Sequence, residues 1–122
     1  FRHEVAARWH AFETAIIGDA AHPTLPFLAQ GANLALEDAW VLAAQLDALP
    51  QREALAAYQT ARKERVTRAI EAANANAQNY HLAGLPRFLG NAGLRAVNAL
   101  SPDLARRRFD WIYGYDAPSV FP

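Results

Sequence analysis

The most informative segment of the sequence reads Gly18-Asp19-Ala20-Ala21-His22-Pro23-Thr24-Leu25-Pro26-Phe27-Leu28-Ala29-Gln30-Gly31-Ala32-Asn33. The residues just before it, 14–17, form a short apolar, β-branched run, which predicts a buried strand ending in a tight turn at Gly18-Asp19. Residues 20–33 contain two prolines, one glycine and no sustained period, so we expect an irregular loop. The predicted order is a strand, an acidic residue, a loop and small residues leading into a helix.

Two features of this segment suit a bound ligand. An Asp at the carboxyl end of a buried strand lies at the edge where open α/β folds bind ligands, and the Asp19 carboxylate can accept hydrogen bonds from a sugar or polyol. The small residues 31–33 lead into a helix N-terminus, which offers unpaired N–H groups and partial positive charge to an electron-rich atom. Each feature also has a plainer explanation, because Gly-Asp pairs after strands are usually turns and a Gly before a helix is usually a cap.

Helices are predicted over most of the remaining chain. The first covers 34–48, capped by Asn33 or Gly31 and followed by Pro50. Residues 51–81 contain neither Gly nor Pro, which predicts one long amphipathic helix. Its stripe is expected to consist of Leu55, Tyr58, Arg62, Val66, Ile70, Ala73 and Ala77.

Further along, the pattern of helices continues. A shorter helix is expected from Arg87 or Phe88 to Leu100, after a break at 84–86. Ser101-Pro102-Asp103 is typical of the start of another helix. The fold class of the chain is therefore mainly α, with one short strand.

The composition limits what the chain can do. Twelve basic and twelve acidic residues cancel, which argues against a broad electrostatic surface for nucleic acid or an anionic membrane, and we expect neither as a partner. No Cys is present, so the chain has no disulfide framework and no cysteine nucleophile, as suits a cytoplasmic protein. It also contains no Met, from which we expect it to be a piece of something longer.

The motif at 18–23, with Pro26, 30–33 and Leu36-Glu37-Asp38-Ala39, resembles the second FAD-binding motif of the group A flavoprotein monooxygenases, most closely that of salicylate and hydroxybenzoate hydroxylases. The pattern Tyr58, Arg62, Arg65 is similar to the long C-terminal helix of that family. The aromatic tail, Trp111-Ile112-Tyr113-Gly114-Tyr115-Asp116, resembles the ends of its salicylate-hydroxylase-like members. The resemblance implies a parent fold of the α/β flavoprotein monooxygenase type, with Rossmann-like binding of FAD and NAD(P). Residues 1–33 would then form the junction of the substrate and FAD domains, with the strand and flavin loop, and 34–122 the C-terminal helical region.

The same resemblance implies a function for this segment. Asp19 would bond the ribityl chain of FAD, and the loop from Pro26 onward would pass beside the isoalloxazine ring, whose pyrimidine edge the N–H groups of Ala32 and Asn33 would face. The implied FAD-binding residues are Gly18, Asp19, Pro26, Gly31, Ala32 and Asn33. Family members reduce FAD with NADH or NADPH and transfer one oxygen atom to an electron-rich ring, so a small aromatic, salicylate- or hydroxybenzoate-like substrate is implied. The chain lacks the Gly-rich ADP-binding fingerprint, and no catalytic residue is predicted in it.

Several other residues that could carry a function are expected to have structural roles. The four histidines lack metal-ligand spacing, so no metal site is predicted, and His22 is expected to be structural, bonding the loop backbone. The basic residues of 62–68 are expected on the solvated face of a helix, and Arg106-Arg107-Arg108 is expected to anchor the C-terminus. Trp9, Trp40 and the tail aromatics are expected in the core.

Two rival functions remain open. The first is a flavoprotein of the same fold with other chemistry, such as halogenation, epoxidation or reduction. The second is a helical interaction module that retains the motif as a structural relic. If the family resemblance holds, the chain alone would leave apolar faces uncovered, and we expect it to self-associate and bind no FAD measurably.

Overall fold

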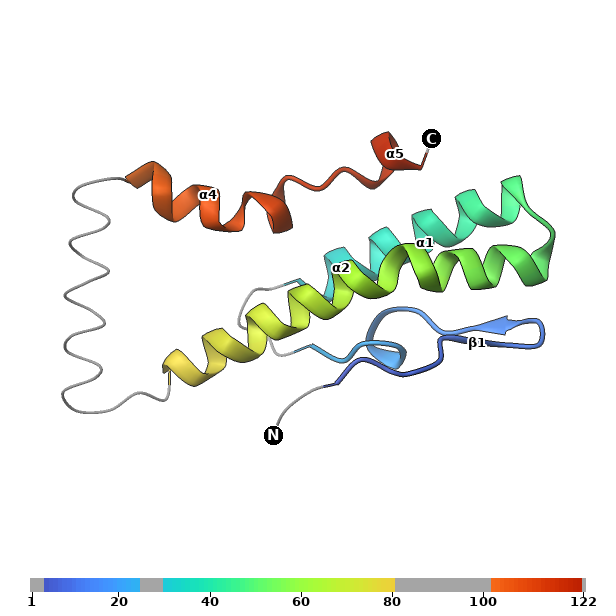
Figure 1. The fold of residues 1–122 in the computed structure, drawn as a ribbon, viewed down its shortest axis with the longest axis horizontal. Coiled ribbons are helices and arrows are strands. Elements are labelled where there is room, and N and C mark those ends of the chain that lie inside the picture. Colours follow the sequence, from blue (N-terminus) through green and yellow to red (C-terminus); the bar gives the residue numbers. More distant parts are fainter. Residues whose placement is uncertain (1–3, 25–29, 81–101, 122) are drawn as a thin grey trace. The chain divides into compact units, whose positions relative to one another are not determined.

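The computed structural model describes residues 4–24, 30–80 and 102–121 (Figure 1). The chain divides into two compact units. One consists of 1–77 with 117–122, and the other of 78–116.

The first unit begins with a small β-hairpin. Strand β1 (His10–Ala11) pairs antiparallel with β2 (Thr14–Ala15), with His10 opposite Ala15. The predicted single buried strand over 14–17 is therefore wrong, since the strand covers two residues and Thr14 is exposed. The physical reason is that strand backbone groups need partners, and residues 10–11 supply them through the turn at Phe12, whose φ is 53°.

The predicted tight turn after the hairpin is confirmed. It takes the form of a short 3-10 helix, η1 (Gly18–Ala20). Gly18 is buried, with a φ of 57°, a left-handed conformation that glycine adopts without strain. Its carbonyl oxygen accepts the N–H groups of Ala21 and His22, each at 2.9 Å, which closes the turn.

Helix α1 (Gly31–Ala48) begins three residues earlier than predicted. The N–H of Leu34 already bonds the carbonyl oxygen of Gln30 at 2.8 Å, so the small residues of the motif form the first turn of the helix rather than the end of the loop. Ala32 is a strong helix former, and the weaker Gly31 and Asn33 are tolerated in a first turn, whose N–H groups have no partner within the helix in any case. The predicted end is confirmed, since Leu49 is extended, as a residue before proline prefers.

Helix α2 (Gln51–Tyr80) confirms the predicted long helix almost to the residue. Because only Leu49 and Pro50 join it to α1, the two helices run antiparallel side by side (Figure 1). The predicted stripe is confirmed as far as the side chains are described. Its buried members are Leu55, Tyr58, Arg62, Val66, Ile70 and Ala73.

Two tryptophans differ in their burial. Trp9 is 1% exposed and belongs to the core, as predicted. Trp40 is 48% exposed, so the prediction that it is a core residue is wrong. The buried residues Leu34 and Val41 define the inner face of α1, and Trp40 lies off that face. Its indole N–H instead donates to the carbonyl oxygen of Phe121 at 2.9 Å, just beyond the short helix α5 (Ala117–Val120).

In the second unit, α4 (Pro102–Tyr113) begins with proline at its first position, as Ser101-Pro102-Asp103 predicted. The predicted helix that ends at Leu100, the break before it, and the side chains of Arg106 and Arg108 lie outside the described residues. Within the described ranges, no helix is long and apolar enough to cross a membrane.

Candidate functional site

The turn after the hairpin presents Asp19 to the outside. Its neighbour Gly18 is buried, whereas Asp19 is exposed. The buried glycine fixes the backbone, and the next residue therefore carries its carboxylate outward from a rigid support.

Two residues of the motif meet at this turn although they are far apart in the sequence. A Cβ atom added at Gly31 would lie 3.8 Å from Oδ1 of Asp19 and only 2.8 Å from Oγ1 of Thr24. The close packing of Thr24 and Asp19 against the start of α1 thus depends on the absence of a side chain at Gly31. A methyl group there would force Thr24 to move.

The start of α1 at Gly31 lies beside the Asp19 turn and is poor in capping groups. The side chain of Gln30 makes no capping hydrogen bond, and the first turn contains no acidic residue. Ala32 and Asn33 follow and are exposed. The first N–H groups of the helix and its partial positive charge are therefore suited to an electron-rich group. Pro26, the remaining predicted site residue, lies outside the described residues.

A fully buried carboxylate, Asp38, lies behind the turn. Its Oδ2 accepts the backbone N–H of Gly18 at 3.0 Å and bonds Nε2 of His22 at 2.5 Å. Its Oδ1 accepts Nε of Arg62 at 2.9 Å. One side chain of α1 thus joins both ends of the turn segment to the long helix α2.

The guanidinium of Arg62 is itself held on two sides. It is fully buried, and its Nη2 lies 2.7 Å from Oε2 of Glu37, so it bridges two consecutive acids of α1. Arg65, one turn further along α2, donates to both carboxylate oxygens of Glu37, each at 2.7 Å. Such bidentate pairs of guanidinium and carboxylate fix the orientation of both side chains in addition to pairing their charges.

His22, Asp38 and Arg62 form a buried cluster, whose hydrogen bonds favour the charged forms of Asp38 and Arg62. Burial alone would raise the pKa of Asp38, but hydrogen bonds from His22, Arg62 and the Gly18 N–H hold it below its usual range. Burial likewise opposes the charge on Arg62, and Asp38 and Glu37 more than offset it, so the pKa of Arg62 is raised. Burial and the Asp38 charge also raise the pKa of the Tyr58 hydroxyl, whose proton is donated to the carbonyl oxygen of Ile16.

Two sequence-based interpretations are corrected here. The sequence assigns Arg62 both to the apolar stripe and, with Arg65, to a solvated face; the solvated face is wrong, because Arg62 is fully buried and Arg65 largely so. His22 was expected to bond the loop backbone, but its Nε2 bonds the Asp38 carboxylate. The signal that identifies the cluster is the position of Arg62 within an apolar stripe, because a buried cation needs a buried anion nearby.

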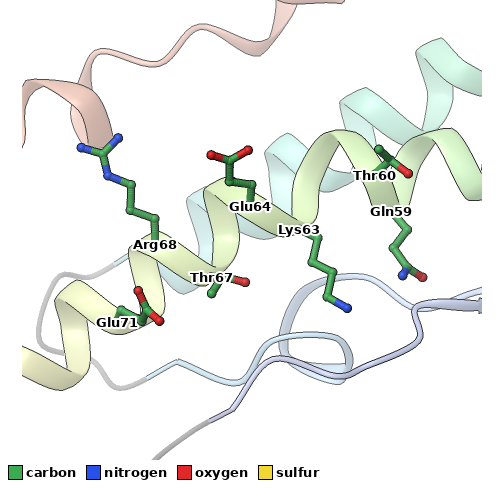
Figure 2. A pocket seen from close by; sticks show the side chains of 7 residues that line it. All are labelled: Gln59, Thr60, Lys63, Glu64, Thr67, Arg68 and Glu71. Carbon is green, nitrogen blue, oxygen red and sulfur yellow. The ribbon is translucent and has the colours of Figure 1, made fainter.

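A shallow depression of about 560 Å³ is a second candidate, and Figure 2 shows that all its side chains come from α2. Two of them are engaged with the N-terminal segment, since Lys63 donates to the carbonyl oxygen of Ala7 at 2.9 Å and Gln59 accepts the N–H of Trp9 at 2.8 Å. The lining consists of Gln59, Thr60, Lys63, Glu64, Thr67, Arg68 and Glu71. A single polar helix face gives a ligand little enclosure, so this depression is the weaker candidate. In the described ranges, no group of three or more His, Cys, Asp or Glu side chains could hold a metal ion.

Comparison with known proteins bears on the turn and on both helices that support it. Residues 1–73 match a family model described as an FAD binding domain. This match covers the hairpin, η1, α1 and most of α2, and so includes every residue of the buried cluster.

Individual relatives resemble nearly the whole chain. A 3-amino-4-hydroxybenzoate 2-monooxygenase of Streptomyces platensis is 36% identical over 98% of this chain. A 3-hydroxybenzoate 6-hydroxylase of Aquipseudomonas alcaligenes is 31% identical over 93%, and a kynurenine 3-monooxygenase of Salinispora tropica is 36% identical over 93%. The chain spans 30%, 35% and 25% of the lengths of these three relatives.

Proposed function

We propose, because this chain belongs to the FAD binding domain family, that it forms part of an FAD-dependent monooxygenase that adds one oxygen atom to a small aromatic ring. Three relatives named as monooxygenases or hydroxylases of aromatic compounds support the proposal, and two of these names contain a hydroxybenzoate. A salicylate- or hydroxybenzoate-like substrate therefore belongs to the same proposal. So does a Rossmann-like parent fold, in which 1–33 contribute the flavin loop and 34–122 the helical region.

In this proposal the Asp19 carboxylate accepts hydrogen bonds from the ribityl hydroxyl groups of FAD. Its exposure and its rigid support at Gly18 are what an acceptor for a polyol requires. The absence of a Cβ at Gly31 lets the start of α1 lie close to the Asp19 carboxylate, with Thr24 packed between them. The residues present thus fit the cofactor.

The start of α1 supplies the second part of the proposed site. The N–H groups of Ala32 and Asn33 would face the electron-rich edge of the isoalloxazine ring, where the helix dipole stabilises negative charge without a mobile cation. Pro26 would stand beside the ring. When bound, FAD would supply the redox chemistry, with NADH or NADPH as the reductant. No residue of this chain is proposed to touch the aromatic substrate.

The observation that carries the proposal is the exposed Asp19 carboxylate beside the bare backbone of Gly31. The test uses the natural protein, meaning the gene product that contains these residues. Asp19→Ala removes a charge-assisted hydrogen bond worth about 1.5–3 kcal/mol, so FAD affinity should fall at least about tenfold on titration followed by flavin fluorescence.

The matched control is Asp47→Ala, which removes an exposed carboxylate from the other end of α1. It should leave FAD affinity within about twofold, as expected for a surface substitution. Equal FAD affinity for the Asp19 variant and the control would remove Asp19 from the site. A natural protein that binds no FAD would instead favour the interaction module over the enzyme.

A further inference from the structure

A single carboxylate oxygen ties together the two ends of the segment that carries Asp19. Oδ2 of Asp38 accepts the N–H of Gly18 at 3.0 Å and bonds Nε2 of His22 at 2.5 Å. Asp19 lies between these two points of attachment. The five-residue segment 18–22 is thus closed from outside by one atom of α1, in addition to its own internal hydrogen bonds.

The carboxylate that closes the segment is itself fixed. Its other oxygen accepts Nε of Arg62 at 2.9 Å, and both side chains are fully buried. Glu37 holds the far side of the same guanidinium at 2.7 Å. Asp38 therefore has little freedom to rotate, and the position of its Oδ2 is set by two helices rather than by the turn.

The turn has little freedom of its own once it is closed. Gly18 adopts a φ of 57°, and its carbonyl oxygen accepts two N–H groups at 2.9 Å. Opening the N–H bond to Asp38 would release the peptide group between Ile17 and Gly18, one residue before Asp19. The orientation of the Asp19 carboxylate relative to Gly31 thus depends on Asp38.

We propose that Asp38 is a positioning residue for cofactor binding, which acts by holding the segment 18–22 so that the Asp19 carboxylate points at the ribityl chain. His22 provides the second attachment of the segment to Asp38, and Arg62 provides the counter-charge that orients the Asp38 carboxylate. This inference rests on the proposed function, because it concerns how Asp19 meets FAD.

A double-mutant cycle on the natural protein tests it by FAD titration. Asp38→Asn weakens both bonds to the turn and, in the presence of Asp19, should lower FAD affinity about tenfold, as loss of a charge-assisted contact does. In an Asp19→Ala background the same substitution should change FAD affinity by less than about twofold, because a residue that acts through Asp19 has nothing left to position. The visible circular dichroism of bound flavin should change with Asp38→Asn and keep its parent form with the control Asp47→Asn.

The outcomes separate the two ideas. If Asp19→Ala weakens FAD and Asp38→Asn weakens it equally in both backgrounds, Asp38 serves the fold alone and the positioning inference is overturned. If Asp19→Ala has no effect on FAD, the proposed function of Asp19 fails first and takes the inference with it.

A milder variant covers the case in which Asp38→Asn does not fold. His22→Phe keeps a ring against Trp9, whose centroid lies 5.4 Å from that of His22, but removes the bond to Oδ2. It should lower FAD affinity by about threefold to tenfold with Asp19 present and by less than about twofold without it. Equal losses in the two backgrounds would overturn the inference in this variant as well.

Discussion

Nε of Arg62 lies 2.9 Å from Oδ1 of Asp38, and this fully buried ion pair joins α2 to α1 across 24 residues of sequence. Two charges removed from water are tolerable only when they are compensated, and within the described residues Arg62 is the one guanidinium that the structure places on the Asp38 carboxylate. Removal of one member therefore has a larger effect than removal of an exposed charge on the same helix.

Arg62→Ala should lower the free energy of unfolding by about 3–5 kcal/mol, because it leaves Asp38 buried without its counter-charge. Urea denaturation of the natural protein, followed by circular dichroism, measures the loss. The matched control is Arg52→Ala at an exposed position of the same helix, which should stay within about 0.5 kcal/mol of the parent. Similar losses for the two variants would contradict a buried pair at Arg62.

The lowered pKa of Asp38 predicts a dependence of stability on pH. A carboxylate whose pKa is lower in the folded state stabilises the fold above its unfolded value of about 3.9, and this contribution is lost as the pH falls through the lowered folded value. The urea midpoint of the parent should therefore fall more steeply than that of Asp38→Asn as the pH decreases below about 4. The control Glu13→Gln, at an exposed position, should keep the parent profile. Identical slopes for the parent and Asp38→Asn would show that this carboxylate does not carry the acid response.

Gly18→Ala should destabilise the fold for two separable reasons. Its φ of 57° disfavours a Cβ by about 1–2 kcal/mol. The added atom would also stand 3.1 Å from Cβ of Ala35, a contact that requires a small displacement of α1. In an Ala35→Gly background the contact disappears and the backbone effect remains, so the loss of unfolding free energy should be smaller there. An unchanged loss in that background would assign the whole effect to the backbone.

Gly31→Ala should disturb the space beside Asp19, because the new Cβ would lie 2.8 Å from Oγ1 of Thr24. We expect FAD affinity to fall by about threefold to tenfold, the scale of one displaced polar contact. Thr24→Ala removes the obstructing hydroxyl, so Gly31→Ala should have a smaller effect on FAD affinity in that background. Equal effects in the two backgrounds would mean that Thr24 is not what limits the space.

The 122-residue chain expressed alone should self-associate and retain no FAD. Two large apolar side chains support this expectation, since Phe12 is 89% exposed and Leu36 is 70% exposed. Leu36→Glu should lower the average mass in sedimentation, whereas Ala43→Glu, at an exposed alanine of the same helix, should not. A monomeric parent chain carrying stoichiometric FAD would contradict both parts.

The helices were predictable from sequence because their signals are local. Pro50 separates two regions free of helix breakers, and the long helix follows the stripe from Leu55 to Ala73. The turn at Gly18 was predictable for the same reason. The β-hairpin was not, because strands as short as 10–11 give no alternating pattern to detect.

The buried cluster was harder to predict because its members are separated by up to 40 residues. Asp38 and Arg62 each look like ordinary charged helix residues. Only their positions mark them as inward-facing, since Asp38 lies one helical turn after Leu34 and Arg62 one turn before Val66. The partner of His22 depends on how α1 lies against the turn, which is a tertiary relationship. Site residues carried by the motif, such as Asp19 and Gly31, could be proposed without it.

The indole of Trp9 gives this cluster an optical reporter. Its ring centroid lies 5.4 Å from that of His22 and 5.7 Å from that of Tyr58, and the side chain is shielded from water. A shielded indole emits at shorter wavelengths than a half-exposed one such as Trp40, so loosening of the segment around His22 should shift the emission to longer wavelengths. Variants that keep only Trp9 among the tryptophans would therefore follow opening of the turn through this single fluorophore.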